Sequence, residues 1–425
     1  MFRSVWFPLV FAVGCGGPQG PGGSDVVHQD VAPVADVPLG PVTPPSKDQA
    51  RVFREATNGF ALDLWRQMGT DGGNLVLSPA SISVAMGMTW GGAAGRTAEQ
   101  MAAVMGFGEG FQAAAGAVLS TWDVPEREAY RLAVANRLFG RPGWPWRDDF
   151  LALTAQTYRA PFEETDFAGA PEPSRLRIND WVEKRTQGRI KDLIPPGGID
   201  ASTAMVLTNA VYFLADWASK FDVNDTWDQP FHAAAGEVRV PTMHQTANFS
   251  YAGTDGVQLL EMPYAGGELS MLIVLPEARD GLADVEARLT VEQLQSWEDE
   301  MGRCLVDVAL PKFRVEPEQS INLKGLLTTM GMPDAFDPSE ADFSGMAERI
   351  PGMNLYITGV FHKAFVAVDE EGTEAAAATA VVAGIESAAP IRETEAFTAD
   401  HPFLFFIRDD VSGAILFMGR VADPS

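Results

Sequence analysis

The side chains best suited to chemistry in this 425-residue sequence are five histidines and two cysteines, and none stands in a catalytic motif. No histidine begins an H-E-x-x-H zinc motif, and there is neither a G-x-S-x-G nucleophile elbow nor a G-x-x-x-x-G-K-[ST] phosphate loop. The histidines are His28, His232, His244, His362 and His401. A Ser/His/Asp triad built from distant segments stays open, because such triads are defined by geometry. The sequence therefore favours a protein that is not an enzyme.

Metal and cofactor sites also lack a sequence basis. Cys15 and Cys304 lie far apart, so they form neither a disulfide framework nor a cysteine-rich zinc site. Cys304 lies in an alternating strand pattern and is expected to pack as a small apolar residue. The acidic run Asp369-Glu370-Glu371 lacks the ligand spacing of a calcium loop and predicts a solvated turn. We expect no metal and no cofactor.

The overall charge excludes several kinds of partner. The chain has 31 Lys and Arg against 57 Asp and Glu, a formal net charge of −26. This sign repels nucleic acid and anionic membrane surfaces. We expect no nucleic-acid partner. With 46% hydrophobic residues, the chain can bury a large core.

The first 15 residues have the pattern of an export signal. Arg3 precedes an apolar run from Val5 to Val13, which is too short to span a bilayer. The ending Ala-Val-Gly-Cys15 resembles a bacterial lipobox, in which the cysteine is lipidated; ordinary secretion is the alternative. Residues 16–47 are rich in Gly and Pro without a periodic apolar face, which predicts a disordered tether. We expect an exported protein, extracellular or anchored at the cell envelope, that meets a membrane only through lipid on Cys15.

Residues 48–425 contain no further stretch of this kind, which favours one large domain. Helical signals dominate its first half. Apolar residues recur every four positions at Val52, Ala56, Phe60 and Leu64, and the stretch Thr97–Gln100 has the form of a capping box.

Strand signals come later in the chain. Apolar runs ending at proline or near the terminus predict strands over 271–275, 305–310 and 414–418. Helices and strands in mixed order, without a βαβ rhythm, indicate an α+β fold.

The most unusual segment is the alanine-rich stretch that follows the acidic run. Composition alone allows a surface helix. With period two, however, small residues and threonines from Thr373 to Val381 occupy both faces of an extended strand, and Glu374 is the only charge among them. Such a segment could enter a sheet without needing a pocket, so helix and insertable loop both remain open on these grounds.

The stretch Asp369–Thr379, DEEGTEAAAAT, resembles the hinge of the reactive-centre loop in the serpins, and other segments match that family in order. They are Asn74–Ser83, Thr208–Phe213 with Trp217, Asn179–Val182 with Thr186–Ile190, Phe361–Lys363, His401–Phe406 and Phe417–Val421. The resemblance covers residues from about 50 to the end. It implies the serpin fold, with three β-sheets, eight or nine helices and an exposed reactive-centre loop.

The resemblance also implies a function. An inhibitory serpin is a suicide substrate: the protease forms an acyl-enzyme on the loop, and the cut loop inserts into the central sheet. The expected target is a serine protease, with a cysteine protease as the alternative, and the expected form is a monomer. A non-inhibitory serpin-fold protein that binds ligands or assists folding is the second hypothesis.

Family spacing assigns roles to the loop residues. The implied hinge residues are Glu370, Gly372, Thr373, Glu374, Ala375, Ala376, Ala377, Ala378 and Thr379. Counting onward places the reactive-site bond between Glu386 and Ser387, and a slip would move it to Ile385, Ala388 or Arg392. Apart from Glu374, none of the residues from Thr373 to Ile385 is a proline, a bulky residue or a charged residue that would block insertion, which favours inhibition.

The resemblance also implies a group of residues that gate the opening of the central sheet. They are Ser78, Ser81, Asn209, Trp217 and His362. His362 is expected to hydrogen-bond Asn209 and to hold the sheet closed.

Overall fold

The computed structural model describes residues 43–68, 72–122, 130–134, 137–373 and 394–425. The export signal, Cys15 and most of the predicted tether lie outside these residues. Residues 37–425 form one compact unit, and only this unit is described below.

The described residues include nine α-helices, within the expected eight or nine. They are α1 (Lys47–Gln67), α2 (Pro79–Trp90), α3 (Gly95–Met105), α4 (Phe111–Trp122), α5 (Asp148–Gln156), α6 (Pro171–Arg185), α7 (Leu282–Arg288), α8 (Val291–Asp299) and α9 (Lys324–Met330). The predicted first helix is confirmed: Ser46 and Gln49 cap α1 reciprocally, and Ala56, Phe60 and Leu64 are buried.

The predicted capping box at Thr97 is wrong, although the helix exists. Helix α3 begins two residues earlier, at Gly95. The Thr97 hydroxyl accepts the backbone N–H of Asp342 at 3.0 Å, and the side-chain Oε1 of Gln100 accepts the backbone N–H of Asp334 at 3.1 Å. These two side chains bind a loop that is distant in the sequence. A local sequence pattern could not reveal such a partner.

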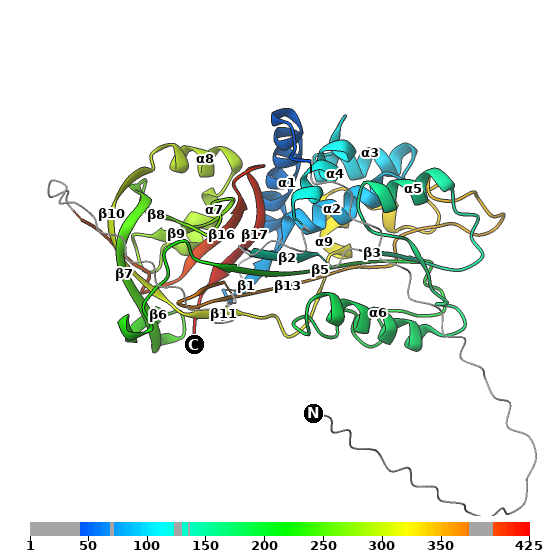
Figure 1. The fold of residues 1–425 in the computed structure, drawn as a ribbon. Helices are drawn as coiled ribbons and strands as arrows, with labels where there is room; N and C mark the ends of the chain where they lie inside the picture. The colour runs from blue at the N-terminus through cyan, green and yellow to red at the C-terminus, as the bar shows by residue number, and fades with distance from the viewer. Residues whose placement is uncertain (1–42, 69–71, 123–129, 135–136, 374–393) are drawn as a thin grey trace, which may run out of the picture. The chain divides into compact units, whose positions relative to one another are not determined.

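The central sheet has eight strands (Figure 1). Its order is β11 (Phe313–Val315), β13 (Val360–Val368), β14 (Gly372–Thr373), β5 (Met205–Asp216), β3 (Arg137–Gly140) and β4 (Glu163–Glu164), with β2 (Tyr130–Val134) on β5 and β12 (Ile321–Asn322) on β13.

The other nine strands form one hydrogen-bonded path. Its order is β1 (Leu75–Leu77), β17 (Ala414–Val421), β16 (Phe403–Asp409), β9 (Leu269–Pro276), β8 (Val257–Pro263), β7 (Gly236–Thr254), β10 (Gly302–Pro311) and β15 (Glu395–Thr398), with β6 (Thr226–Ala233) on β7. The 19-residue β7 pairs along most of its length with β6 and β10, and its last five residues pair with β8. It therefore links two sheets, which with the central sheet gives the three expected. The strands predicted at 271–275, 305–310 and 414–418 are confirmed as β9, β10 and β17.

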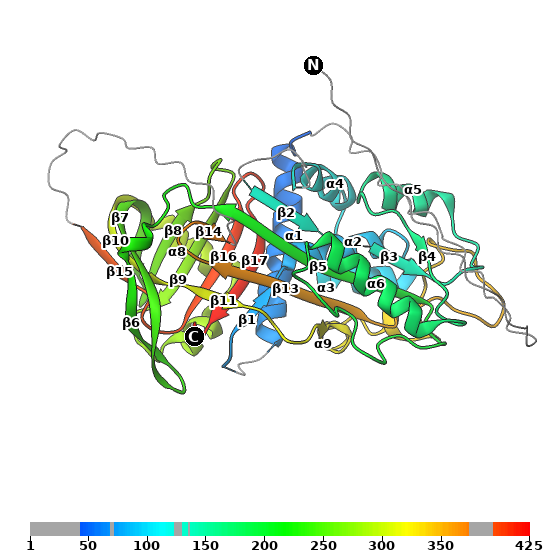
Figure 2. The ribbon, with the colours of Figure 1, turned by 60° about the horizontal axis from the view of Figure 1, so that its bottom comes forward.

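Both faces of the central sheet are covered. Helices α1 to α4 lie on one side and α6 on the other (Figure 1), and Figure 2 shows α6 crossing in front of β5 and β3. The main core fills the first side, while α6 packs through Ile178 and Val182 on a second apolar cluster that includes Phe139 and Phe361. Strand β13 is consequently buried along nearly its whole length.

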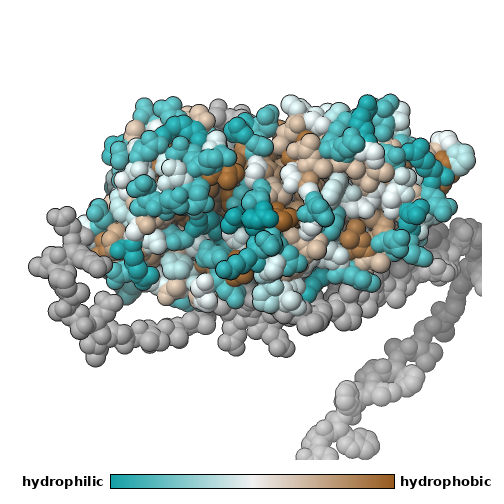
Figure 3. Space-filling view, turned by 90° about the horizontal axis from the view of Figure 1, so that it is seen from above, coloured by the Kyte–Doolittle hydropathy of each residue, from teal (hydrophilic) through white to brown (hydrophobic). Residues whose placement is uncertain are grey.

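On the face that carries α1 and α8, hydrophilic residues dominate and hydrophobic residues occur in small scattered groups (Figure 3). Within the described part of the chain, no helix is long and apolar enough to cross a bilayer.

Candidate functional site at the entrance to the central sheet

The acidic run forms a tight turn between β13 and β14. The Asp369 carboxylate accepts the backbone N–H of Glu371 at 3.0 Å and of Gly372 at 3.3 Å, and the Asp369 N–H donates to the Gly372 carbonyl at 2.9 Å. Aspartate favours such reversals because its side chain replaces a backbone partner. The turn sends the chain back antiparallel to β13.

The two residues after the turn lie between β13 and β5. Gly372 pairs with Asp216, and Thr373 pairs with Ala215 on one side and with Val368 on the other. The Thr373 side chain is fully buried, and its hydroxyl oxygen lies 2.6 Å from that of Tyr264. Burial raises the pKa of Tyr264, so its phenol stays protonated. Thr373 therefore already occupies the first position of an additional strand between β5 and β13.

Gly372 leaves no room for a side chain. A Cβ atom at this position would lie 2.0 Å from the carbonyl oxygen of Ala215 and 2.7 Å from the Cα of Asp216. Only glycine allows β14 to approach β5 this closely.

The prediction of a solvated acidic turn is wrong. Glu370 is only 6% exposed and forms an ion pair with Lys312 at 2.7 Å, while Glu371 pairs with Lys220 at 2.5 Å. Burial opposes ionisation of Glu370, but hydrogen bonds led by Lys312 outweigh it and lower the pKa of the carboxyl. Burial raises the pKa of Asp369. The turn is thus fixed to the body by both of its glutamates.

Backbone contacts attach the same turn to the segment that follows β5. The N–H groups of Trp217 and Phe221 donate to the carbonyls of Glu371 and Glu370, at 2.8 and 3.0 Å. The Trp217 indole N–H donates to the Asp369 carbonyl at 3.0 Å.

Of the residues predicted to gate the sheet, Trp217 is therefore the one that contacts the hinge directly. Its ring stacks on Tyr264 with centroids 4.5 Å apart. Trp217 and Tyr264 thus form a buried aromatic pair next to the first residues of the loop.

His362 lies farther along β13, where β13 and β5 pair directly and in parallel. The contact runs from Val360 with Leu207 to Phe365 with Tyr212. His362 is fully buried, and its Nε2 accepts the backbone N–H of Ser78 at 3.1 Å. Burial lowers the pKa of His362 to about 3, so the ring is neutral.

The serines of the predicted gate are buried near this histidine at the start of α2. The Ser78 hydroxyl donates to the Leu416 carbonyl at 2.6 Å, and Ser81 is also buried. Asn209 is the strand partner of His362. Its side chain, and the hydrogen bond expected from it, lie outside what the structure describes.

Several predicted site residues fall outside the described parts of the chain. They are Cys15, Glu374, Ala375, Ala376, Ala377, Ala378, Thr379, Glu386 and Ser387. The described site is therefore the anchored base of the loop and the closed strand pair ahead of it.

Sequence reasoning missed Tyr264, Lys312 and Lys220. Lys312 directly follows the strand that ends at Pro311, so it could have been noted as a lone cation at a strand end. Tyr264 and Lys220 carry no local signal, since Tyr264 is 109 residues from Thr373 and Lys220 is 151 residues from Glu371.

Among the residues that the structure describes, no group of three or more His, Cys, Asp or Glu side chains is arranged to hold a metal ion. Cys304 is partly buried and packs against the core.

Comparison with known proteins places this geometry in a family. The family described as Serpin (serine protease inhibitor) matches residues 55–424. A human protein named leukocyte elastase inhibitor is 39% identical over 381 residues, covering 87% of this chain and 98% of its own length. A serpin-like protein of Thermococcus kodakarensis is 40% identical over 383 residues, covering 88% of this chain and 87% of its own length.

Solved structures agree with the sequence relatives. The native-state structure of the thermophilic serpin tengpin superposes with a TM-score of 0.79 at 28% identity, covering 91% of this chain and 97% of that one. Uncleaved ovalbumin gives a TM-score of 0.76 at 29% identity, covering 88% of this chain and all of that one. The chain belongs to the serpin family.

Proposed function

We propose that this protein inhibits a serine protease as a suicide substrate, trapping the acyl-enzyme by inserting its cleaved loop between β5 and β13, and that it is not itself an enzyme. The observation that carries the proposal is the position of Thr373, which already pairs with both strands. Relatives whose names include leukocyte elastase inhibitor and antithrombin-III support it.

The strand pairing of β14 can be extended along the contact between β5 and β13. Extended one residue at a time from Thr373, it would place Thr379 opposite Asn209 on β5 and opposite His362 on β13. Asn209 and His362 are themselves register partners, so the two extensions agree. A strand continued from the hinge therefore fits between β5 and β13 without a shift of either.

The side chains of the loop suit that path. Thr373 points into the core, so Ala375, Ala377, Thr379 and Val381 would follow it on the same face. Ala383 would lie opposite Met205, where β5 begins, and Glu386 would arrive just beyond. The 12 residues of β5 span eleven steps of about 3.3 Å, so the inserted strand would run about 36 Å along the sheet.

Insertion would release free energy. The inserted strand would bond to both neighbours, whereas β13 and β5 now bond to each other along this contact, so the net gain is about one ladder of hydrogen bonds. A dozen such bonds at about 0.5–1.5 kcal/mol each give roughly 6–18 kcal/mol. This is comparable with the stability of a whole domain and is enough to distort a bound protease.

The direct test is to mix the protein with a panel of serine and cysteine proteases and look for an SDS-resistant adduct. We expect an adduct with at least one serine protease. Cleavage of the loop without any adduct across the panel would contradict inhibition and favour the non-inhibitory, ligand-binding or folding-assistance role.

Thr373→Arg should convert the inhibitor into a substrate. An arginine at this fully buried position would have to leave its charge unpaired between strands, which costs several kcal/mol. We expect loop cleavage at an unchanged rate with loss of the adduct on SDS gels. Thr329→Arg on the exposed side of α9 is the matched control and should trap the protease normally.

We also propose Glu386-Ser387 as the reactive-site bond, which implies a protease that accepts an acidic residue. A basic pocket on the protease would bind this carboxylate. Mass spectrometry of the released C-terminal fragment tests the assignment, and a fragment beginning elsewhere than Ser387 would replace it.

Finally, we propose that the protein acts as an exported monomer held at the cell envelope by lipid on Cys15. The basis is the apolar leader and the lipobox-like ending in the sequence. Metabolic labelling with palmitate should mark the wild type and not Cys15→Ala. Equal labelling of both, or of neither, would contradict lipidation.

A further inference from the structure

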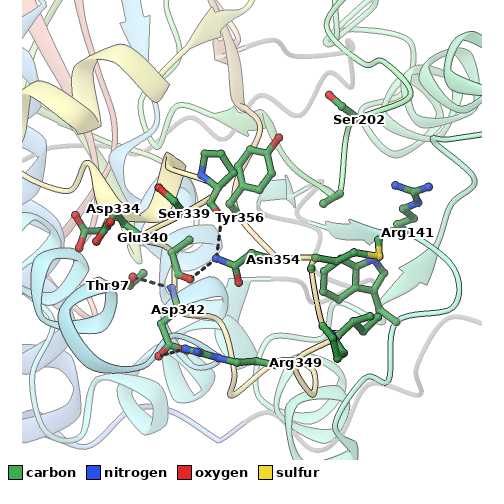
Figure 4. Close-up of a pocket in the computed structure, with 18 of the residues that line it drawn as sticks. Thr97, Arg141, Ser202, Asp334, Ser339, Glu340, Asp342, Arg349, Asn354 and Tyr356 are labelled. Carbon is green, nitrogen blue, oxygen red and sulfur yellow. Dashed lines mark hydrogen bonds and ion pairs between the residues drawn. The ribbon is translucent and has the colours of Figure 1, made fainter.

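A cavity of about 870 Å³ lies at the end of the central sheet where β5 and β13 begin. One wall comes from the segments after β3 and before β5, including Arg141, Trp144 and Ser202. The other wall is the loop that leads from the short helix Asp334–Phe336 to β13, including Met353 and Tyr356. Figure 4 shows the labelled side chains of both walls around the cavity.

The charges that line this cavity are not fully paired. Arg96 forms ion pairs with Asp334 and Glu340, and Arg349 pairs with Asp342 at 2.8 Å. The guanidinium of Arg141 forms no ion pair or hydrogen bond with the residues that the structure describes, although the side chain is partly buried. The Arg141 guanidinium is thus available to an anionic occupant of the cavity.

A second donor in the cavity wall is also unsatisfied. Trp144 is 7% exposed, and its indole N–H is buried without an acceptor in the described part of the chain. That nitrogen is closed to a water-sized molecule, so an occupant of the cavity would meet the ring of Trp144 and not its N–H.

The cavity also has an apolar part. Met353 is 44% exposed, which is high for a large hydrophobic residue, and it follows Ile350 and Pro351 in a turn closed by the bridge between Ile350 and Met353. All three residues line the cavity. An occupant with an apolar body could cover them.

We propose that the cavity binds a small organic carboxylate, with Arg141 as the partner of the carboxylate and Met353 and Trp144 against the apolar body. Arginine suits this role because its planar guanidinium can hold a carboxylate by two parallel hydrogen bonds.

The position of the cavity links such a ligand to the central sheet. The Arg141 N–H donates to the Ala204 carbonyl at 3.0 Å, so this wall is fixed to the start of β5. Met353 and Tyr356 belong to the segment that enters β13, where the Thr358 hydroxyl donates to the Met205 carbonyl at 2.7 Å. A ligand that contacts both walls would hold the starts of β5 and β13 together. On the proposed function, on which this consequence rests, it would slow insertion of the loop.

Binding is tested by calorimetric titration of the full chain with naphthalene-2-carboxylate and with its neutral analogue, 2-naphthalenemethanol. We expect the carboxylate to bind at least about tenfold more tightly than the alcohol, and Arg141→Gln to remove that difference. Arg66→Gln, an exposed arginine on α1, is the matched control and should bind like the wild type.

Several outcomes would overturn the proposal: no binding of the carboxylate at about 1 mM, equal binding of both compounds, or unchanged binding by Arg141→Gln. Arg141→Lys, which keeps the charge, should bind with intermediate affinity. If Arg141→Gln fails to fold, as judged by circular dichroism, Arg141→Lys and Met353→Ser carry the test, and full affinity in both would refute the assignment.

The link to insertion is tested separately. Saturating naphthalene-2-carboxylate should lower the fraction of protease recovered as SDS-resistant adduct, at the expense of cleaved protein, in the wild type and not in Arg141→Gln. An unchanged fraction in the wild type would refute the link while the binding result stands. Absence of any adduct without ligand would instead count against the proposed function.

Discussion

At the residue level, the base of the loop depends on a glycine that admits no side chain and a threonine that is fully enclosed. Gly372 brings β14 against the backbone of β5, and Thr373 then lies between β5 and β13. Neither role follows from the composition of the hinge. The resemblance to the serpins supplied the positions, and the contacts with Ala215 and Tyr264 supply the physical reason.

Gly372→Ala should therefore destabilise the hinge. A Cβ atom 2.0 Å from the Ala215 carbonyl oxygen must displace a strand, and overpacking of this kind costs about 1–3 kcal/mol. We expect a lower urea midpoint and faster proteolysis near the hinge. Gly325→Ala is the control, because a Cβ there meets nothing within 4 Å and the helix should gain stability. Equal midpoints for Gly372→Ala and the wild type would contradict the account.

His362 should make the closed sheet sensitive to acid. Burial lowers its pKa from 6.5 to about 3 in the folded chain, so between these values the unfolded chain binds more protons. The free energy of unfolding must then fall as the pH is lowered, by about 1.6 kcal/mol between pH 6.5 and 5 from this group alone. Urea titrations should show a smaller pH dependence for His362→Gln than for the wild type. The same dependence in both proteins would contradict this role.

At the level of elements, the sequence predicted those whose signal is local. Strands β9, β10 and β17 are apolar runs, and α1 has a four-residue apolar period that faces the core. The acidic turn was misjudged because its partners are remote: Lys312 is 58 residues from Glu370. The two-residue β14 has no periodic signal, since its place is set by β5 and β13 rather than by its own residues.

At the scale of the whole molecule, we propose that the intact protein has fewer backbone hydrogen bonds than its cleaved form would have. If nicking by a non-target protease lets the loop insert, the gain of roughly 6–18 kcal/mol should appear as higher thermal stability. We expect the unfolding midpoint to rise by about 20 °C after cleavage, as measured by calorimetry. Thr373→Arg should show a much smaller rise, and an unchanged midpoint in the nicked wild type would mean that the loop stays outside the sheet.

The central sheet can open only if β5 and β13 separate along their parallel contact. Val211 and Ala364 are register partners in the middle of this contact. Neighbouring strands lie about 4.8 Å apart, within the span that a disulfide can bridge. Val211→Cys with Ala364→Cys, made in a Cys304→Ser background, should therefore lock the sheet closed when oxidised.

The fate of a protease mixed with this locked variant tests loop insertion most directly. We predict that the oxidised variant is cleaved as a substrate without an SDS-resistant adduct, and that reduction with dithiothreitol restores the adduct. The single variant Val211→Cys should trap the protease in both conditions. An oxidised, locked variant that traps the protease as well as the wild type would contradict insertion between β5 and β13.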